Sequence, residues 1–202
     1  MLIKEATALV AGLANPSKMP GKAYGLPAKE CKVGSKLRAI KGSTCEGCYA
    51  LKGQYRFRTV QAAQYRRLDT ITTPAWVDAM VTLISRENWF RWHDSGDLQS
   101  VSHLLRIMDV CDRTPNTKHW LPTRENQIVK IVLATRDCPA NLIIRISDAM
   151  VDALPVKFHQ HTSGVTTDKS NATCPAYQQG GECNNCRKCW DKSIPRVIYP
   201  KH

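Results

Sequence analysis

The chain has 202 residues, 43% of them hydrophobic, so it is long enough to bury a core and short enough to form one domain. A formal net charge of +12 predicts an anionic partner such as nucleic acid, although the charge could also balance an anionic cofactor or form a solvated surface. No stretch approaches the roughly 18 consecutive apolar residues of a membrane span, so we expect no membrane partner and a cytoplasmic location.

Residues 11 to 54 are rich in glycine, proline, lysine and serine, without a sustained helical or strand period, so we expect an ordered loop there. From about Tyr55 to Arg86 the apolar residues recur at helical spacing. This segment predicts two helices, the second beginning near Pro74.

Short apolar runs then alternate with helical segments. Strands are predicted at 89–93, 118–123, 142–147 and 156–161, and helices at 98–112, 125–137 and 148–153. Alternating βα units build a parallel sheet, because each crossover needs a helix. Four strands are too few to close an eight-stranded barrel, so we expect an α/β fold with a truncated parallel (β/α) barrel or an open parallel sheet.

We expect a single domain over residues 1–202 that has three segments. Residues 1–54 form a cysteine-bearing N-terminal loop region, and 55–161 hold the helices and βα units. Residues 162–202 form a C-terminal segment that binds a metal cluster.

Parallel βα folds place their chemistry at the carboxyl ends of the strands. Polar side chains gather at the ends of the predicted strands, and they are candidates for lining a catalytic pocket: His93, Asp94, Asp97, Arg124, His159 and His161. Asp97 is also placed to cap the helix that follows it.

Nine cysteines in a chain without a secretory signal argue against a disulfide framework and for reduced thiols that bind metal. Cys183, Cys186 and Cys189 follow the C-x2-C-x2-C spacing of bacterial ferredoxins, and Cys174 lies shortly before them. The spacing predicts a [4Fe–4S] cluster. Zinc is the alternative, because pairs of cysteines two residues apart also hold tetrahedral Zn²⁺.

A second group of cysteines, Cys31, Cys45 and Cys48, lies near the N-terminus. Three ligands leave one iron of a cluster open, which substrate or S-adenosylmethionine coordination requires. Seven clustered thiols divide into four plus three, but one cluster with three spare thiols fits the count equally well. Cys111 and Cys138 stand apart and read as small hydrophobic residues.

Five segments resemble the gene product eighty-eight family of tailed-bacteriophage proteins: LPAKECKVGSKL (26–37), GSTCEGCYALKGQY (42–55), FRWHDSGDLQS (90–100), WLPTRE (120–125) and CPAYQQGGECNNCRKCWD (174–191). The resemblance implies a viral protein in the host cytoplasm and supplies no reaction. It places Cys31 and Cys174 within motifs, which supports both as ligands.

The chain is more loosely similar to radical S-adenosylmethionine enzymes, which combine a partial TIM barrel with a three-cysteine cluster. It departs from their C-x3-C-x2-C pattern: Lys41 stands at the place of the first cysteine and Gly47 at that of the aromatic residue. Binding of S-adenosylmethionine is therefore an expectation from the resemblance alone.

Three functional hypotheses follow. The first is an iron–sulfur protein that exchanges electrons with a donor or supports radical chemistry, and whether it is an enzyme stays open. The second is a basic nucleic-acid-binding module with a structural metal. The third is a protein that binds a host partner and uses a cluster to hold its two ends together.

Overall fold

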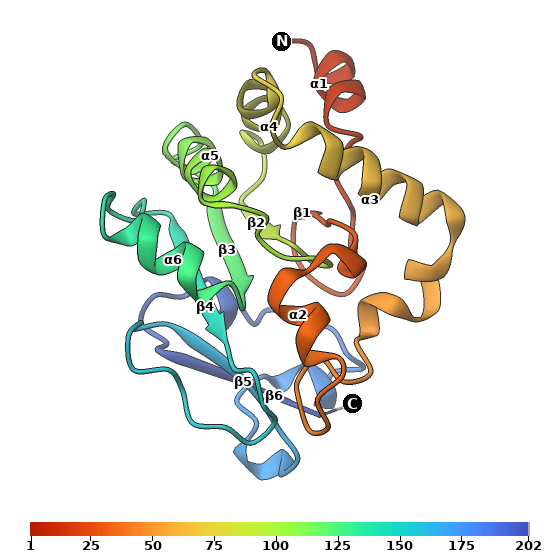
Figure 1. Ribbon diagram of the computed structural model, residues 1–202. Coiled ribbons are helices and arrows are strands. Elements are labelled where there is room, and N and C mark those ends of the chain that lie inside the picture. The colour runs from red at the N-terminus through yellow and green to blue at the C-terminus, as the bar shows by residue number, and fades with distance from the viewer. Residues whose placement is uncertain (202) are drawn as a thin grey trace.

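A six-stranded sheet, parallel at every neighbouring pair, organises residues 1–201, the part of the chain that the computed structural model describes. The strands lie side by side in sequence order, with the first and last at the two edges, so the sheet is open (Figure 1). Their bounds are β1 (Lys22–Tyr24), β2 (Trp89–Trp92), β3 (Lys118–Thr123), β4 (Leu142–Ser147), β5 (Thr162–Thr166) and β6 (Arg196–Pro200).

Helices cover one face of this sheet (Figure 1). Their bounds are α1 (Ile3–Leu9), α2 (Lys32–Leu37), α3 (Arg58–Thr70), α4 (Trp76–Ile84), α5 (Val101–Asp112) and α6 (Asn126–Leu133). α5 and α6 are the crossovers after β2 and β3, and they lie on the same side, as right-handed parallel connections require. Among residues 1–201, no helix is both long and apolar enough to cross a membrane.

Alternation along β2 separates the two faces of the sheet. Phe90 and Trp92 are fully buried on the helical side, where they join the main core with α4 and α5. Trp89 and Arg91 point to the other face. α5 fits this core because Leu104, Met108 and other apolar residues recur at helical spacing along it.

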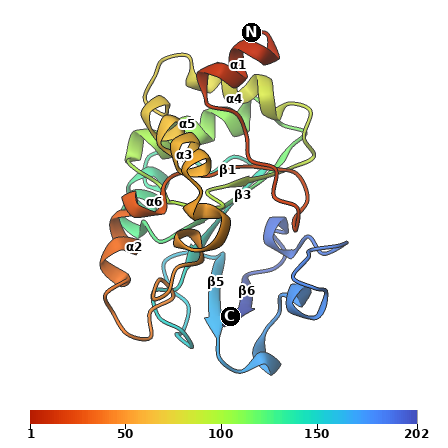
Figure 2. The same ribbon diagram turned by 90° about the vertical axis from the view of Figure 1, so that its right-hand side faces the viewer.

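The second face is covered by the C-terminal segment, which lies across the sheet from the helices (Figure 2). Trp190 packs its ring edge-on against Trp120 at 5.1 Å and donates from Nε1 to the Phe90 carbonyl at 2.9 Å. Cys189 and Val197 are buried with them in a second, smaller core. The cysteine-bearing C-terminus is therefore part of the sheet packing.

Most of the central elements predicted from sequence are confirmed, namely the helices within 55–86, the strands at 89–93, 118–123 and 142–147, and the helices that follow the first two of these strands. The sheet is open and parallel, one of the two forms expected.

Two predicted elements are wrong. Residues 156–161 form a loop, and β5 begins at Thr162, immediately after it. The aromatic residue of that run, Phe158, packs its ring under the Lys130 ammonium and stays 39% exposed. Residues 148–153 form turns in place of a helix, with Asp152 at φ +59° in the left-handed region.

The expected N-terminal loop is also more structured than predicted, since it contains β1 and α2. β1 is only three residues long and α2 is a helix of six, which explains why neither gives a periodic signal.

Candidate functional site

Four thiols of the C-terminal segment line one cavity. Cys174, Cys183, Cys186 and Cys189 surround it together with Trp190 and Val197. The cavity measures about 10 Å³, the room of one water molecule, so the segment has to open outward to admit a larger group. The sequence grouping of these four cysteines therefore corresponds to a grouping in space.

Backbone hydrogen bonds anchor two points of the segment that carries the C-terminal thiols, residues 174–189, which we call the thiol segment. The Cys174 amide donates to the Ile198 carbonyl of β6 at 3.0 Å, and the Cys183 amide donates to the Lys18 carbonyl at 2.8 Å. Between these anchors Gly180 and Gly181 both have positive φ, which residues with a side chain rarely adopt. The segment is thus tied to β6 at Cys174 and to the loop before β1 at Cys183, and it turns sharply between them.

Arg145 of β4 holds the turn that carries Cys189, beyond these two anchors. It is fully buried, and its guanidinium donates to the carbonyls of Lys188, Cys189 and Asp191 at 2.9 to 3.0 Å. No carboxylate within residues 1–201 forms an ion pair with it. Its charge is therefore met mainly by backbone carbonyls of the turn that carries Cys189, with a longer contact of 3.5 Å to the Thr162 carbonyl of β5.

Burial dominates the electrostatics of the C-terminal thiols. It raises the pKa of Cys189 to about 12, although the Tyr199 hydroxyl, 3.2 Å from the sulfur, favours the thiolate. It also raises the pKa values of Cys174 and Cys183. The buried thiols are therefore held protonated, and a bound metal would supply the positive charge that stabilises their thiolates.

The three N-terminal thiols form a second group. A Cβ atom on Gly34 of α2 would lie 3.5 Å from the Cys45 sulfur and 3.7 Å from the Cys31 sulfur, so these two sulfurs border the same glycine. Burial, followed by the charges of Asp97, Cys48 and Cys45, raises the pKa of Cys31 to about 12. Cys48 is thus close enough to interact electrostatically with Cys31.

The N-terminal thiol loop is attached to the carboxyl edge of the sheet. Tyr49 donates from its hydroxyl to the Asp94 carbonyl at 2.6 Å, and Arg124 donates to the Thr44 hydroxyl at 2.8 Å. The Val33 amide donates to a Glu125 carboxylate oxygen at 2.9 Å. These contacts bring Cys31, Cys45 and Cys48 to the edge where the sequence predicted the chemistry.

Four of the six predicted pocket residues gather at that edge: His93, Asp94, Asp97 and Arg124. Asp97 accepts from the Thr123 hydroxyl at 2.6 Å and from the Arg124 amide at 2.9 Å, yet burial raises its pKa to about 6. It does not cap α5, since Ser100 does so by accepting from the His103 amide.

His93 is held in a strained conformation directly after β2. Its φ is +56°, it is 3% exposed, and neither ring nitrogen has a hydrogen-bond partner within the described chain. Burial lowers its pKa well below the usual value, so the ring is neutral. Strain and unpaired nitrogens are typical of residues retained for function.

His159 and His161 do not join this group. Both precede β5, because the strand predicted at 156–161 is a loop. His159 contacts the Ile144 carbonyl and His161 the Lys192 carbonyl, each through Nε2. The prediction that they mark the carboxyl end of a strand is wrong.

The sequence reasoning missed Arg145 and Arg91. A signal for Arg145 was present, since a lone arginine interrupts the apolar run LIIRIS of a buried strand. Arg91 donates to the Tyr49 hydroxyl at 3.3 Å, beside Cys48, and its charge favours the thiolate form of Cys183. It therefore lies between the two thiol groups.

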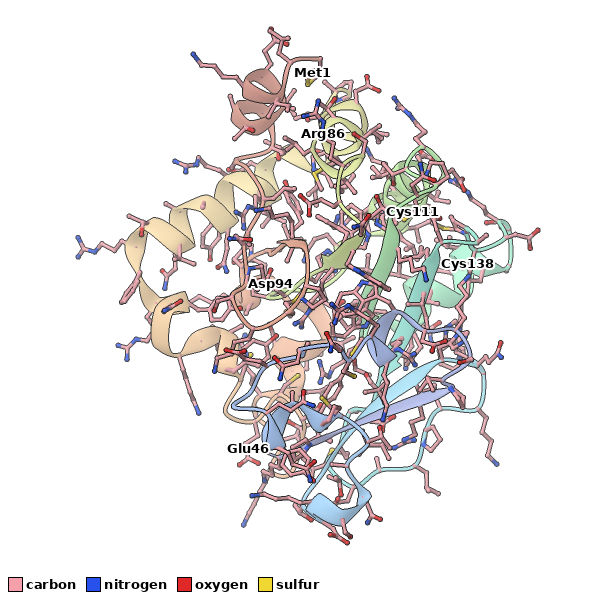
Figure 3. The ribbon with its side chains drawn as sticks, turned by 180° about the vertical axis from the view of Figure 1, so that it is seen from behind. Met1, Glu46, Arg86, Asp94, Cys111 and Cys138 are labelled. Carbon is pink, nitrogen blue, oxygen red and sulfur yellow. The ribbon has the colours of Figure 1, made fainter. Side chains whose placement is uncertain are left out.

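The two isolated cysteines, Cys111 and Cys138, lie apart from both groups of thiols. Cys111 is fully buried in the main core, and Cys138 packs at its margin. Figure 3 shows both far from Glu46, which lies between Cys45 and Cys48 in the sequence.

Within residues 1–201, no three His, Cys, Asp or Glu side chains are placed to hold one metal ion. A zinc ion bound at about 2.3 Å by four sulfurs would bring them to about 3.8 Å from each other. In a cluster each thiolate binds a different iron, so the sulfurs stand further apart. As placed, the side chains of residues 1–201 therefore form no site for a single ion.

Comparison with models of known protein families gives a match over residues 1–192, to the family described as gene product 88. No curated protein and no solved structure matches the chain. These comparisons give no support to the looser similarity to radical S-adenosylmethionine enzymes.

Proposed function

This chain belongs to the gene product 88 family of phage proteins, and we propose that it binds iron–sulfur clusters through its two groups of thiols. The observation that carries the proposal is the single cavity lined by Cys174, Cys183, Cys186 and Cys189. Four thiolates are the complete ligand set of a 4Fe–4S cluster. We expect the protein to act in the host cytoplasm, where thiols stay reduced.

The surroundings of this cavity support a cluster of net negative charge. Four thiolates around a 4Fe–4S core leave about −2, and Arg91 and Arg145 both favour the thiolate form of Cys189. Apart from Lys188, the other residues that line the cavity are apolar, Trp190 and Val197 among them. Buried cations beside an apolar wall stabilise an anionic cluster and keep water from it.

The N-terminal thiols supply three ligands for a second cluster. One iron would then lack a cysteine, and the charged side chains of Asp97 and Arg124 lie close enough to influence the pKa of Cys31. A polar ligand bound at that iron would face these residues. One protein could therefore use the C-terminal cluster to transfer electrons and the N-terminal cluster to bind and transform a substrate.

The direct test is the metal content of the protein purified without oxygen. Iron and acid-labile sulfide are counted per chain, and zinc is measured in the same sample. The proposal predicts equal amounts of iron and sulfide, about four per occupied site, with a brown colour. A result of one zinc and no iron per chain would mean that the site holds a structural zinc ion and no cluster.

Chemistry at the N-terminal site has its own test. The reduced, iron-loaded protein is incubated with S-adenosylmethionine, and the products of its reductive cleavage are measured. Cleavage that is lost in Cys45→Ser and kept in Cys183→Ser assigns the reaction to the N-terminal site. Iron-loaded protein that leaves S-adenosylmethionine intact restricts the clusters to electron transfer or structure.

A further inference from the structure

A cavity of about 570 Å³ opens at the amino-terminal edge of the sheet, opposite the edge that holds His93 and Asp97. Trp89 and Lys118 line it at the first residues of β2 and β3, and Asn141 lines it just before β4. The volume lies within the range of about 300 to 1,000 Å³ that small-molecule sites occupy. None of the thiol ligands proposed above lines it.

Positive charge dominates the lining of this cavity. Lys118, Arg187 and Lys192 face one acidic residue, Asp191. The Asp191 carboxylate accepts from the Ser193 amide and hydroxyl, and none of the ion pairs of the described chain includes the three cations. The cavity thus offers cationic donors to an anion such as phosphate.

Aromatic surface lies beside these cations. The Trp89 and Trp190 rings meet edge to face at 5.7 Å. The Lys118 ammonium lies 5.1 Å and the Arg187 guanidinium 5.4 Å from the centre of the Trp89 ring. Both cations lie over the Trp89 ring, so a nucleobase that stacks on this indole takes the place of one of them, and the displaced cation can neutralise the phosphate of the same molecule.

A fixed hydrogen-bond acceptor completes the cavity. Asn141 donates from Nδ2 to the carbonyls of Cys111, Thr114 and Thr117 at 2.9 to 3.0 Å. The two N–H groups share these three carbonyls, which fixes the side-chain amide and leaves its oxygen as an acceptor that suits the amino group of a base.

We propose that this cavity binds a nucleotide, with the base against Trp89 and the phosphate at Lys118 and Lys192. The nucleotide is either a free mononucleotide or the terminal nucleotide of a single strand, since both present the same base and phosphate. The cavity shares Trp190 with the four-thiol cavity, but the nucleotide site stands without any cluster.

Calorimetric titration of the full-length protein at low salt tests the proposal. The probes are the four ribonucleoside monophosphates, adenosine, inorganic phosphate and a 5′-phosphorylated oligothymidylate of ten nucleotides. A nucleotide site predicts that at least one monophosphate, or the oligonucleotide alone if the source is a strand end, binds more tightly than adenosine or phosphate.

Variants locate the binding. Lys118→Gln and Trp89→Leu are each expected to weaken nucleotide binding about tenfold. The first removes a contact to the phosphate, and the second removes the contact to the base. Lys4→Gln, which neutralises an exposed lysine of α1, is the matched control and leaves affinity unchanged. Circular dichroism establishes that each variant is folded.

Two results would overturn the proposal. One is the absence of binding by all monophosphates and by the oligonucleotide at low salt. The other is nucleotide binding that is equally strong in wild type, Lys118→Gln and Trp89→Leu, which would place it on the general basic surface.

Discussion

Arg145 is the residue on which the C-terminal thiol segment most depends. It is fully buried and donates to three carbonyls of the turn that carries Cys189. Replacing it by glutamine removes these charged hydrogen bonds and leaves buried carbonyls unpaired, so we expect a loss of about 3 kcal/mol in the free energy of unfolding. Chemical denaturation measures this loss, and the iron content is expected to fall with it.

Two further variants calibrate that prediction. Lysine keeps the charge but lacks the several N–H donors of the planar guanidinium. Arg145→Lys should therefore lower the free energy of unfolding nearly as much as Arg145→Gln. Arg113→Gln breaks an exposed ion pair with Asp78 and should change stability by less than about 1 kcal/mol. Equal stability of the Arg145→Gln and Arg113→Gln proteins would refute the role of Arg145.

His119 makes stability depend on pH. Its ring is fully buried, stacks on Trp92, and contacts the Thr114 hydroxyl through Nε2 at 2.8 Å. Because that hydroxyl donates to the Val110 carbonyl, it accepts from Nε2, which therefore carries a proton. Burial lowers its pKa to about 3.

The unfolded chain binds a proton at His119 near pH 6.5, and the folded chain only near pH 3. The neutral His119 ring therefore contributes its full stabilisation of the folded state above about pH 6.5, and this contribution is lost as the pH falls from 6.5 toward 3. His119→Gln should lessen the loss of unfolding free energy between pH 7 and pH 5 by about 2 kcal/mol, measured by urea denaturation. His161→Gln, in the loop before β5, is the control; identical pH profiles for wild type and His119→Gln would exclude this effect.

Single residues were predictable from sequence where a reliable strand positioned them. His93, Asp94, Asp97 and Arg124 gather as expected because β2 and β3 were correctly placed. His159 and His161 were misplaced with their strand. The neighbourhood of Arg91 could not be predicted, since its contacts come from loops distant in sequence.

At the scale of elements, α2 determines the space around the N-terminal thiols. Gly34 is buried there, and a side chain at this position would press on Cys31 and Cys45. We expect Gly34→Val to reduce iron at the N-terminal site while the C-terminal site keeps about four irons per chain. Lys36→Ala, an exposed change in the same helix, should keep the full iron content.

This prediction is checked by counting iron per folded chain after purification without oxygen. Loss of iron from both sites in Gly34→Val would mean that the helix supports the whole fold. Unchanged iron would remove the N-terminal thiols from the ligand set.

Long amphipathic elements were predictable, and short ones were not. α4 and α5 bury apolar residues at helical spacing, and β2 to β4 are apolar runs, so their patterns are visible in the sequence. β5 reads TSGVT, and a Cβ at Gly164 would lie 2.6 Å from an Asp148 carboxylate oxygen. The close approach of Asp148 selects glycine there, and glycine weakens the strand signal.

On the scale of the whole molecule, the C-terminal segment is a second layer over a sheet whose other face is covered by helices (Figure 2). Its small core of Trp120, Trp190 and Val197 would be tightened by a cluster bound at the adjacent thiols. Because such binding acts only on the folded state, iron-loaded protein should melt at a higher temperature than protein treated with an iron chelator. Differential scanning calorimetry of the two samples measures the difference; equal melting temperatures would contradict a cluster that holds this layer to the sheet.

The iron content of wild type and two paired variants tests the central claim most directly. Cys183→Ser with Cys186→Ser disables the C-terminal site, and Cys45→Ser with Cys48→Ser disables the N-terminal site. Two clusters predict about eight irons and eight sulfides per wild-type chain and about four of each in either variant. Wild-type protein that holds zinc and no iron, or no metal at all, would contradict the account.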